Sequence, residues 1–164
     1  MSELSIENIR HAADVLKAVA RKTDMIYAPK LSGQAQVYLK TENLQVTGSF
    51  KVRGAYYKIS KLTEAELARG VIACSAGNHA QGVALGAQQR GAKAVICMPD
   101  IAPIAKVEAT KSYGAEVRLV PGSYDDASAY AAKLCAERKM TFVHPFDDPD
   151  VIAGQGTVGL EILE

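Results

Sequence analysis

The chain has 164 residues, of which 48% are hydrophobic and 23% are charged, and its formal net charge is +1. This composition is typical of a soluble globular protein and carries no electrostatic footprint for nucleic acid or an anionic membrane. No apolar run approaches the roughly 20 residues needed to span a bilayer, and the first residues show no signal-peptide pattern. We therefore expect a cytoplasmic protein with neither nucleic-acid nor membrane partners.

The amino-terminal part predicts helices around one short strand. Ser5 is typical of the N-cap of an amphipathic helix, and residues 36–40 alternate polar and apolar as a strand does. A second helix is predicted from just after Gly48 to about residue 62. Residues 63–66 then form a capping box that opens a third, shorter helix.

Residues 70–147 alternate between short apolar strands and helices. The strands are expected at 71–74, 94–98, 117–120 and 141–143, with helices at 77–89, 104–112 and 125–138 between them. Near-continuous apolar strands alternating with helices indicate a parallel sheet covered on both faces. Right-handed crossovers then give a Rossmann-like α/β layer. Gly70, Gly91 and Gly114 stand where helices end before re-entry into the sheet.

A last helix is predicted from near Pro149 into the final residues. The sequence stops there with no capping glycine and no following strand, so we expect an incomplete chain. Residues 154–159 match GxGxxG, but a dinucleotide fingerprint needs a strand before it and a βαβ unit around it. We interpret this run as close packing of a glycine-rich helix.

Metal and disulfide chemistry find little support. Cys74, Cys97 and Cys135 are odd in number, lie far apart in apolar stretches and form no CxxC pair. This pattern favours small buried hydrophobic residues in a reducing compartment. The acidic residues at 147, 148 and 150 precede a predicted helix, so capping and the helix dipole explain them without a cation.

The loop Ser75-Ala76-Gly77-Asn78-His79 is the first candidate binding site. In an open parallel sheet, ligands bind outside the carboxyl ends of the strands. Small residues let a ligand approach the backbone, and the following helix N-terminus favours an anion such as a carboxylate or phosphate. An ordinary loop with a polar cap remains the alternative. The same dipole disfavours a protonated His79, so we expect a neutral imidazole.

Lys51 is the second candidate. It is flanked by Phe50 and Val52, and Gly48 and Gly54 allow close backbone approach. An apolar, partly desolvated setting would lower the pKa of the lysine, as Schiff-base chemistry requires. A helical lysine is otherwise most often a solvated surface residue, and these neighbours alone leave both interpretations open.

Two long segments carry a resemblance to a known family. Residues 42–55, which include Thr47-Gly48-Ser49-Phe50-Lys51-Val52-Arg53-Gly54, resemble the lysine motif of the fold-type II pyridoxal 5'-phosphate (PLP) enzymes. The branch is that of the threonine/serine dehydratases, which are similar to the tryptophan synthase beta subunit. Residues 75–82 resemble the substrate loop of the same branch, and shorter stretches at 102–106, 109–116 and 153–157 also fit.

The resemblance implies roles for individual residues. Lys51 would be the catalytic residue and hold PLP as a Schiff base. Asn78 would hydrogen-bond the phenolate oxygen of the PLP ring, and Phe50 would pack beside the pyridine. The pocket for the substrate carboxylate would be lined, largely through backbone N–H groups, by Ser75, Ala76, Gly77, Asn78 and His79.

The resemblance also implies an activity. The family's threonine (and serine) ammonia-lyases deaminate L-threonine by β-elimination to 2-oxobutanoate and ammonia. Serine racemases share both motifs, so a racemase stays open, as does a non-catalytic α/β ligand-binding fragment. An amino acid would be the small-molecule partner, and the full-length form would be a homo-oligomer, either a dimer or a tetramer.

Three segments follow from the same resemblance. Residues 1–69 would begin a large PLP domain, 70–147 would form a small parallel α/β domain, and 148–164 would return into the large domain. Related enzymes continue with a glycine-rich loop for the PLP phosphate and a hydroxyl residue at the pyridine nitrogen, and neither is found here. We therefore expect the fragment alone to be inactive. Within the matched part, Asp24 and Ala76 replace the more usual proline and serine.

Overall fold

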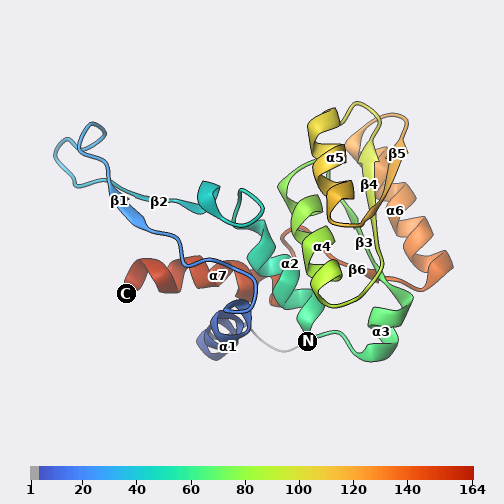
Figure 1. Cartoon of the computed structure of the whole chain (residues 1–164), viewed down its shortest axis with the longest axis horizontal. Coiled ribbons are helices and arrows are strands. Elements are labelled where there is room, and N and C mark those ends of the chain that lie inside the picture. The colour runs from blue at the N-terminus through green and yellow to red at the C-terminus, as the bar shows by residue number, and fades with distance from the viewer. Residues whose placement is uncertain (1–3) are drawn as a thin grey trace.

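A computed structural model describes residues 4–164 and places a four-stranded sheet beside a group of packed helices (Figure 1). In chain order the elements are α1 (Ile6–Leu16), β1 (Met25–Tyr27), β2 (Tyr38–Lys40), the 3-10 helix η1 (Glu42–Leu44), α2 (Lys51–Ser60), α3 (Glu64–Arg69), β3 (Val71–Cys74), α4 (Asn78–Gln89), β4 (Ala94–Pro99), α5 (Ile104–Ser112), β5 (Glu116–Val120), α6 (Tyr124–Arg138), β6 (Thr141–Phe142) and α7 (Pro149–Leu163).

The sheet has the strand order β5-β4-β3-β6, and every pairing in it is parallel. Side chains alternate between its two faces. Val71 and Ala73 of β3 lie in one core with α4 and α5, whereas Ile72 and Cys74 lie in a second core with α6. Figure 1 shows α4 and α5 on one side of the sheet and α6 on the other. The predicted Rossmann-like α/β layer is confirmed.

Local capping signals set the helix ends. Ser5 caps α1, and capping boxes also open α3 and α6. Gly70, Gly91 and Gly114 have φ values of +86°, +65° and +81°, which a residue with a side chain rarely adopts. These glycines therefore let the chain turn from helix to strand, as predicted.

The three cysteines and the acidic residue Asp148 have structural roles. Cys74 and Cys97 are register partners on β3 and β4, and both are buried and free, while Cys135 is half-buried and free. Burial raises the pKa of the Cys97 thiol to about 11. Asp148 caps α7 by accepting hydrogen bonds from two backbone N–H groups of its first turn. Within residues 4–164 no group of three or more His, Cys, Asp or Glu side chains is placed to hold a metal ion.

Helix α2 is packed between α4 and α7 at backbone contact distance. A Cβ added at Gly82 of α4 would lie 3.1 Å from the backbone of Lys51. A Cβ added at Gly154 of α7 would lie only 2.6 Å from the carbonyl oxygen of Arg53 and from Cα of Gly54. The glycine run at 154–159 lies inside α7, so its interpretation as helix packing is confirmed.

The segment predicted as a strand at 36–40 forms β2, which pairs with a strand that the sequence pattern did not predict. This partner, β1, is antiparallel to β2, with Ile26 opposite Leu39 and Tyr27 opposite Tyr38. All four of these side chains are exposed. Figure 1 shows the two-stranded ribbon reaching away from the helices.

In the described part of the chain, no helix combines the length and apolar character that a membrane crossing requires.

The contact between α2 and α7 predicts opposite effects for two alanine substitutions in the same helix. Gly154→Ala should lower the free energy of unfolding by about 1–3 kcal/mol, because backbone atoms must move to admit the new methyl group. Gly159→Ala should leave it unchanged or raise it by up to about 1 kcal/mol. An added Cβ there meets nothing within 4 Å among residues 4–164, and alanine favours a helix interior. Urea unfolding followed by circular dichroism measures both. Equal stabilities would contradict the close contact.

Candidate functional site

Lys51 and the loop after β3 meet at the same edge of the sheet. Nζ of Lys51 donates a 2.6 Å hydrogen bond to the carbonyl oxygen of Pro145, which follows β6. Because β6 is the parallel neighbour of β3, the carboxyl ends of the two strands lie side by side. The predicted amine and the predicted loop, Ser75 to His79, are therefore brought to one place.

The surroundings of Lys51 make its protonated form less favourable than that of an ordinary lysine. The side chain is half-buried, and this burial lowers the pKa of its amine below the ordinary lysine value. The ring of Phe50 lies beside it, with 5.5 Å between Nζ and the ring centroid. Phe50 is 42% exposed, so part of its side chain is accessible to a ligand. The ring of Phe50, the N-cap of α2, thus lies beside the amine of Lys51, the first residue of that helix.

The loop leads into an uncapped helix. Gly77 is the N-cap of α4 and has no side chain that could cap the helix, while its own N–H donates to Oγ of Ser75 at 3.2 Å. The first N–H groups of α4 are therefore available to an anion. Ser75, Ala76 and Gly77 are half-buried and Asn78 is exposed. Nζ of Lys106, on α5, lies 3.4 Å from Oδ1 of Asn78 and adds positive charge.

His79 is placed differently from the rest of the loop. Its Nε2 lies 2.9 Å from the carbonyl oxygen of Val143, so Nε2 carries the ring proton. Its Nδ1 is buried without a hydrogen-bond partner in the described chain. Burial, and after it the nearby charge of Lys51, lowers the pKa of His79 to about 4. These surroundings agree with the predicted neutral imidazole, although burial is the main cause and the prediction rested on the helix dipole. The ring turns toward the segment after β6, so only the backbone of His79 is left to line a pocket.

The site also contains a group that sequence reasoning missed. The carbonyl oxygen of Pro145 holds the Lys51 amine, and a main-chain oxygen leaves no signal in a residue pattern. The other histidines have structural partners. His144 accepts hydrogen bonds from the N–H groups of Phe146 and Asp147, and His11 lies 2.9 Å from the hydroxyl of Tyr57.

The buried neutral His79 predicts a pH-dependent stability. An unfolded histidine takes up a proton below its ordinary pKa of 6.5, whereas folded His79 stays neutral down to about 4. Its contribution is thus fully present above the unfolded pKa and is lost as the pH falls toward the folded one. Between about pH 7.5 and about pH 5 the loss should be about 2 kcal/mol. His79→Gln, which keeps a donor for Val143, should lack this loss. Urea unfolding at both pH values tests it, and identical pH dependence in the two proteins would contradict it.

Comparisons with known proteins agree on one family. The family described as pyridoxal-phosphate dependent enzyme matches residues 16–164. The L-threonine ammonia-lyase of Thermotoga maritima is 51% identical over 163 residues, which cover 98% of this chain and 41% of that protein. The chain therefore spans less than half the length of this relative.

Solved structures give the same result. The processed form of threonine deaminase isoform 2 from Solanum lycopersicum has a TM-score of 0.87 and 40% identity, covering 99% of this chain and 46% of that one. Maize serine racemase has a TM-score of 0.93 and 32% identity, covering 99% of this chain and 50% of that one. The family match covers nearly all of the sequence, including helix α2 with Lys51 and the loop before α4. The chain therefore belongs to the pyridoxal-phosphate dependent enzymes.

Proposed function

We propose that this chain carries the lysine side of the active site of a threonine ammonia-lyase, which converts L-threonine to 2-oxobutanoate and ammonia. The observation that carries the proposal is the position of the Lys51 amine, which is half-buried and bound to the carbonyl oxygen of Pro145 at the sheet edge where β3 ends and α4 begins. The 51% identity with an L-threonine ammonia-lyase supports the choice of substrate.

The residues present fit the cofactor of the family. Lys51 has a primary amine, and its lowered pKa raises the fraction of neutral amine that can react with the aldehyde of PLP. The aromatic ring of Phe50 lies beside this amine. Oδ1 of Asn78 accepts from Nζ of Lys106, whereas its Nδ2 has no partner among residues 4–164 and would donate to the ring oxygen of PLP. When bound, PLP supplies an electron sink for negative charge on the substrate's Cα.

The chain's own groups would then divide the remaining work. Lys51, as a neutral amine, would take the proton from the substrate's Cα. The loop from Ser75 to His79 would hold the substrate carboxylate. The N–H groups of Ser75 and Gly77 already donate to the carbonyl oxygen of Cys97 and to Oγ of Ser75, so the contact would use the N–H groups of Asn78 and His79, where the helix dipole stabilises an anion. The carbonyl oxygen of Pro145 would accept a hydrogen bond from the Lys51 amine whenever this amine is not bound to the cofactor or to the substrate.

A serine racemase is the second candidate, because the maize enzyme has a TM-score of 0.93 with this chain. Its identity of 32% is well below the 51% of the threonine ammonia-lyase, so we favour the lyase. Lys51 and the loop serve both reactions in the same way. Assays for 2-oxobutanoate from L-threonine and for D-serine from L-serine separate the two.

Further features complete the proposal. The protein would act in the cytoplasm, on an amino acid, and as a homo-oligomer (dimer or tetramer) in its full-length form. Residues 1–69 and 148–164 would belong to a large domain and residues 70–147 to a small one. The shared core of Ala12, Tyr57 and Ala153, from α1, α2 and α7, supports the grouping of the first and last segments.

Covalent capture tests the assignment of Lys51 and separates it from a non-catalytic fragment. The chain is incubated with PLP, reduced with borohydride and mapped by peptide mass spectrometry. We expect label on Lys51 in preference to the exposed lysines, because its lower pKa leaves more neutral amine. Lys51→Ala should abolish this label, whereas Lys61→Ala, at the C-cap of the same helix, should preserve it. Labelling spread evenly over all lysines would sink the proposal.

Threonine turnover by the full-length protein provides the second test. Lys51→Ala should lower kcat by about 10²–10⁴-fold, the usual contribution of a proton-transferring side chain. The release of 2-oxobutanoate is followed by reduction with a coupled dehydrogenase. An active Lys51→Ala variant would show that another group takes the proton.

A further inference from the structure

We propose that Arg53 is a positioning residue that fixes the rotation of helix α2 about its axis and thereby aims Lys51 at the site. The inference rests on the proposed function in one respect only, namely that Lys51 is the reacting amine.

Arg53 is the centre of a buried ionic cluster. Its Nε and Nη2 donate to the two carboxylate oxygens of Glu42 at 2.9 and 2.7 Å, and Nη1 and Nη2 donate to those of Glu161 at 2.6 and 2.9 Å. Nη1 also donates to Thr157 at 3.1 Å, and Nη2 to the carbonyl oxygen of Arg21 at 3.2 Å. The guanidinium thus joins α2 to η1, to α7 and to the segment after α1.

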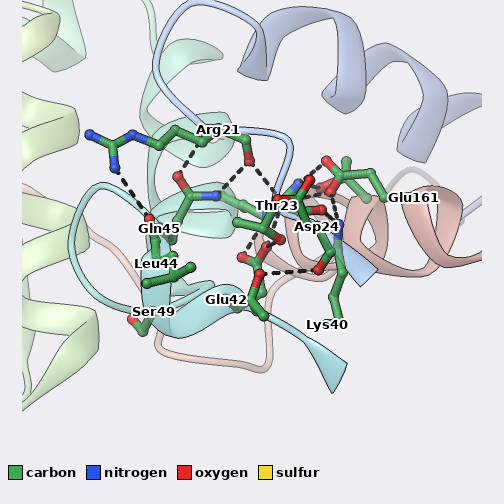
Figure 2. A network of polar contacts seen from close by, with 12 residues as sticks. Arg21, Thr23, Asp24, Lys40, Glu42, Leu44, Gln45, Ser49 and Glu161 are labelled. Carbon is green, nitrogen blue, oxygen red and sulfur yellow. Dashed lines mark hydrogen bonds and ion pairs between the residues drawn. The ribbon is translucent and has the colours of Figure 1, made fainter. Parts of the chain in front are cut away.

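The surrounding residues hold the two carboxylates in turn. The hydroxyl of Thr23 donates to Glu42 at 2.6 Å, and Nζ of Lys40 donates to Glu161 at 2.5 Å. Figure 2 shows Thr23, Lys40, Glu42 and Glu161 converging on one cluster. Arg53 is 1% exposed and Glu42 is 8% exposed. Burial alone would raise the pKa of Glu42, but the hydrogen bonds and charge of Arg53 outweigh it and lower the pKa. The pair therefore stays ionised.

Geometry links this cluster to Lys51. Two residues correspond to about 200° of rotation around an α-helix, so Lys51 and Arg53 project from opposite sides of the first turn of α2. The contacts agree, since Lys51 reaches Pro145 beyond β6 while Arg53 reaches η1 and α7. Any rotation of α2 that moved the amine would also break several hydrogen bonds of the guanidinium.

Packing and ion pairs hold α2 in different ways. Gly82 of α4 and Gly154 of α7 let the backbones approach closely, and apolar side chains of α2 such as Ile59 and Tyr57 pack in the adjoining cores. Apolar contacts are not directional, so the strongest directional contacts of α2 are those of its charged side chains. At the far end of α2, Lys58 pairs with Asp148 at 2.8 Å, but this lysine side chain is 20% exposed, against 2% for Arg53. A partly exposed ion pair holds its geometry less tightly than a buried, bidentate one.

The test uses a charge-balanced variant, Arg53→Met/Glu42→Gln. It removes one positive and one negative charge together and leaves the pair of Lys40 and Glu161 intact. Removing both partners of a buried pair avoids the uncompensated charge that would unfold the chain. The matched control, Arg118→Met/Glu116→Gln, makes the same changes in an ion pair on β5 that is more than 40% exposed.

The readout is the state of Lys51 itself, without PLP. Lysines are methylated with 13C-formaldehyde, their NMR signals are titrated, and the Lys51 signal is assigned by its loss in Lys51→Arg. In the wild type and in the control, Lys51 should titrate below the exposed lysines. In Arg53→Met/Glu42→Gln its pKa should rise toward theirs, because an unfixed helix lets the amine reach solvent. The preference for Lys51 in PLP capture should fall by about tenfold.

A folded Arg53→Met/Glu42→Gln variant with wild-type titration of Lys51 would overturn the inference, and so would an equal change in the control. If this variant does not fold, Arg53→Lys decides. It keeps the charge but loses the planar guanidinium, which contacts both oxygens of each carboxylate. A shifted Lys51 titration in the folded Arg53→Lys protein supports the positioning role, and an unshifted one overturns it. A wild type that takes up no PLP would sink the proposed function alone, because the titration needs no cofactor.

Discussion

Helix α2 lies at backbone distance from α4 on one side and from α7 on the other, because glycine occupies both interfaces. This contact determines how the other elements of the molecule are placed. Through α4 it connects the amino-terminal helices to the parallel sheet, and through α7 it connects them to the carboxyl-terminal helix. It also places Lys51, the first residue of α2, beside the carboxyl ends of β3 and β6. A bulkier residue at either interface would move the amine away from the loop that faces it.

Much of the fold could be predicted because it follows from local rules. The strands of the sheet are short apolar runs between capped helices, so their order along the chain and their approximate ends can be read from the pattern. The strand β1 could not be predicted from the sequence. Its three residues, Met25 to Tyr27, show no alternation, and they become a strand only through pairing with β2. Such pairing depends on tertiary position, which a window of sequence does not contain.

The candidate site also has a part that the sequence predicts and a part that it does not. Topology alone predicts that the loop from Ser75 lies at the ligand-binding edge of the sheet, and the structure brings the Lys51 amine to that edge. The direction of the His79 ring and the carbonyl oxygen of Pro145 depend on how the segment after β6 returns across the sheet. The ion-pair partners of Arg53 could not be predicted from the sequence either. Glu42 and Glu161 lie 11 and 108 residues away in sequence, and no periodicity relates them.

The ribbon of β1 and β2 has a consequence for handling the protein. It is a sheet of two strands, so each strand has an outer edge whose N–H and C=O groups have no ladder partner among residues 4–164. Ile26, Tyr27, Tyr38 and Leu39 are all 46% exposed or more beside those edges. Exposed apolar edge strands add further strands from neighbouring molecules. In concentrated solution we therefore expect aggregation to begin at this ribbon, with the packed sheet and helices still folded.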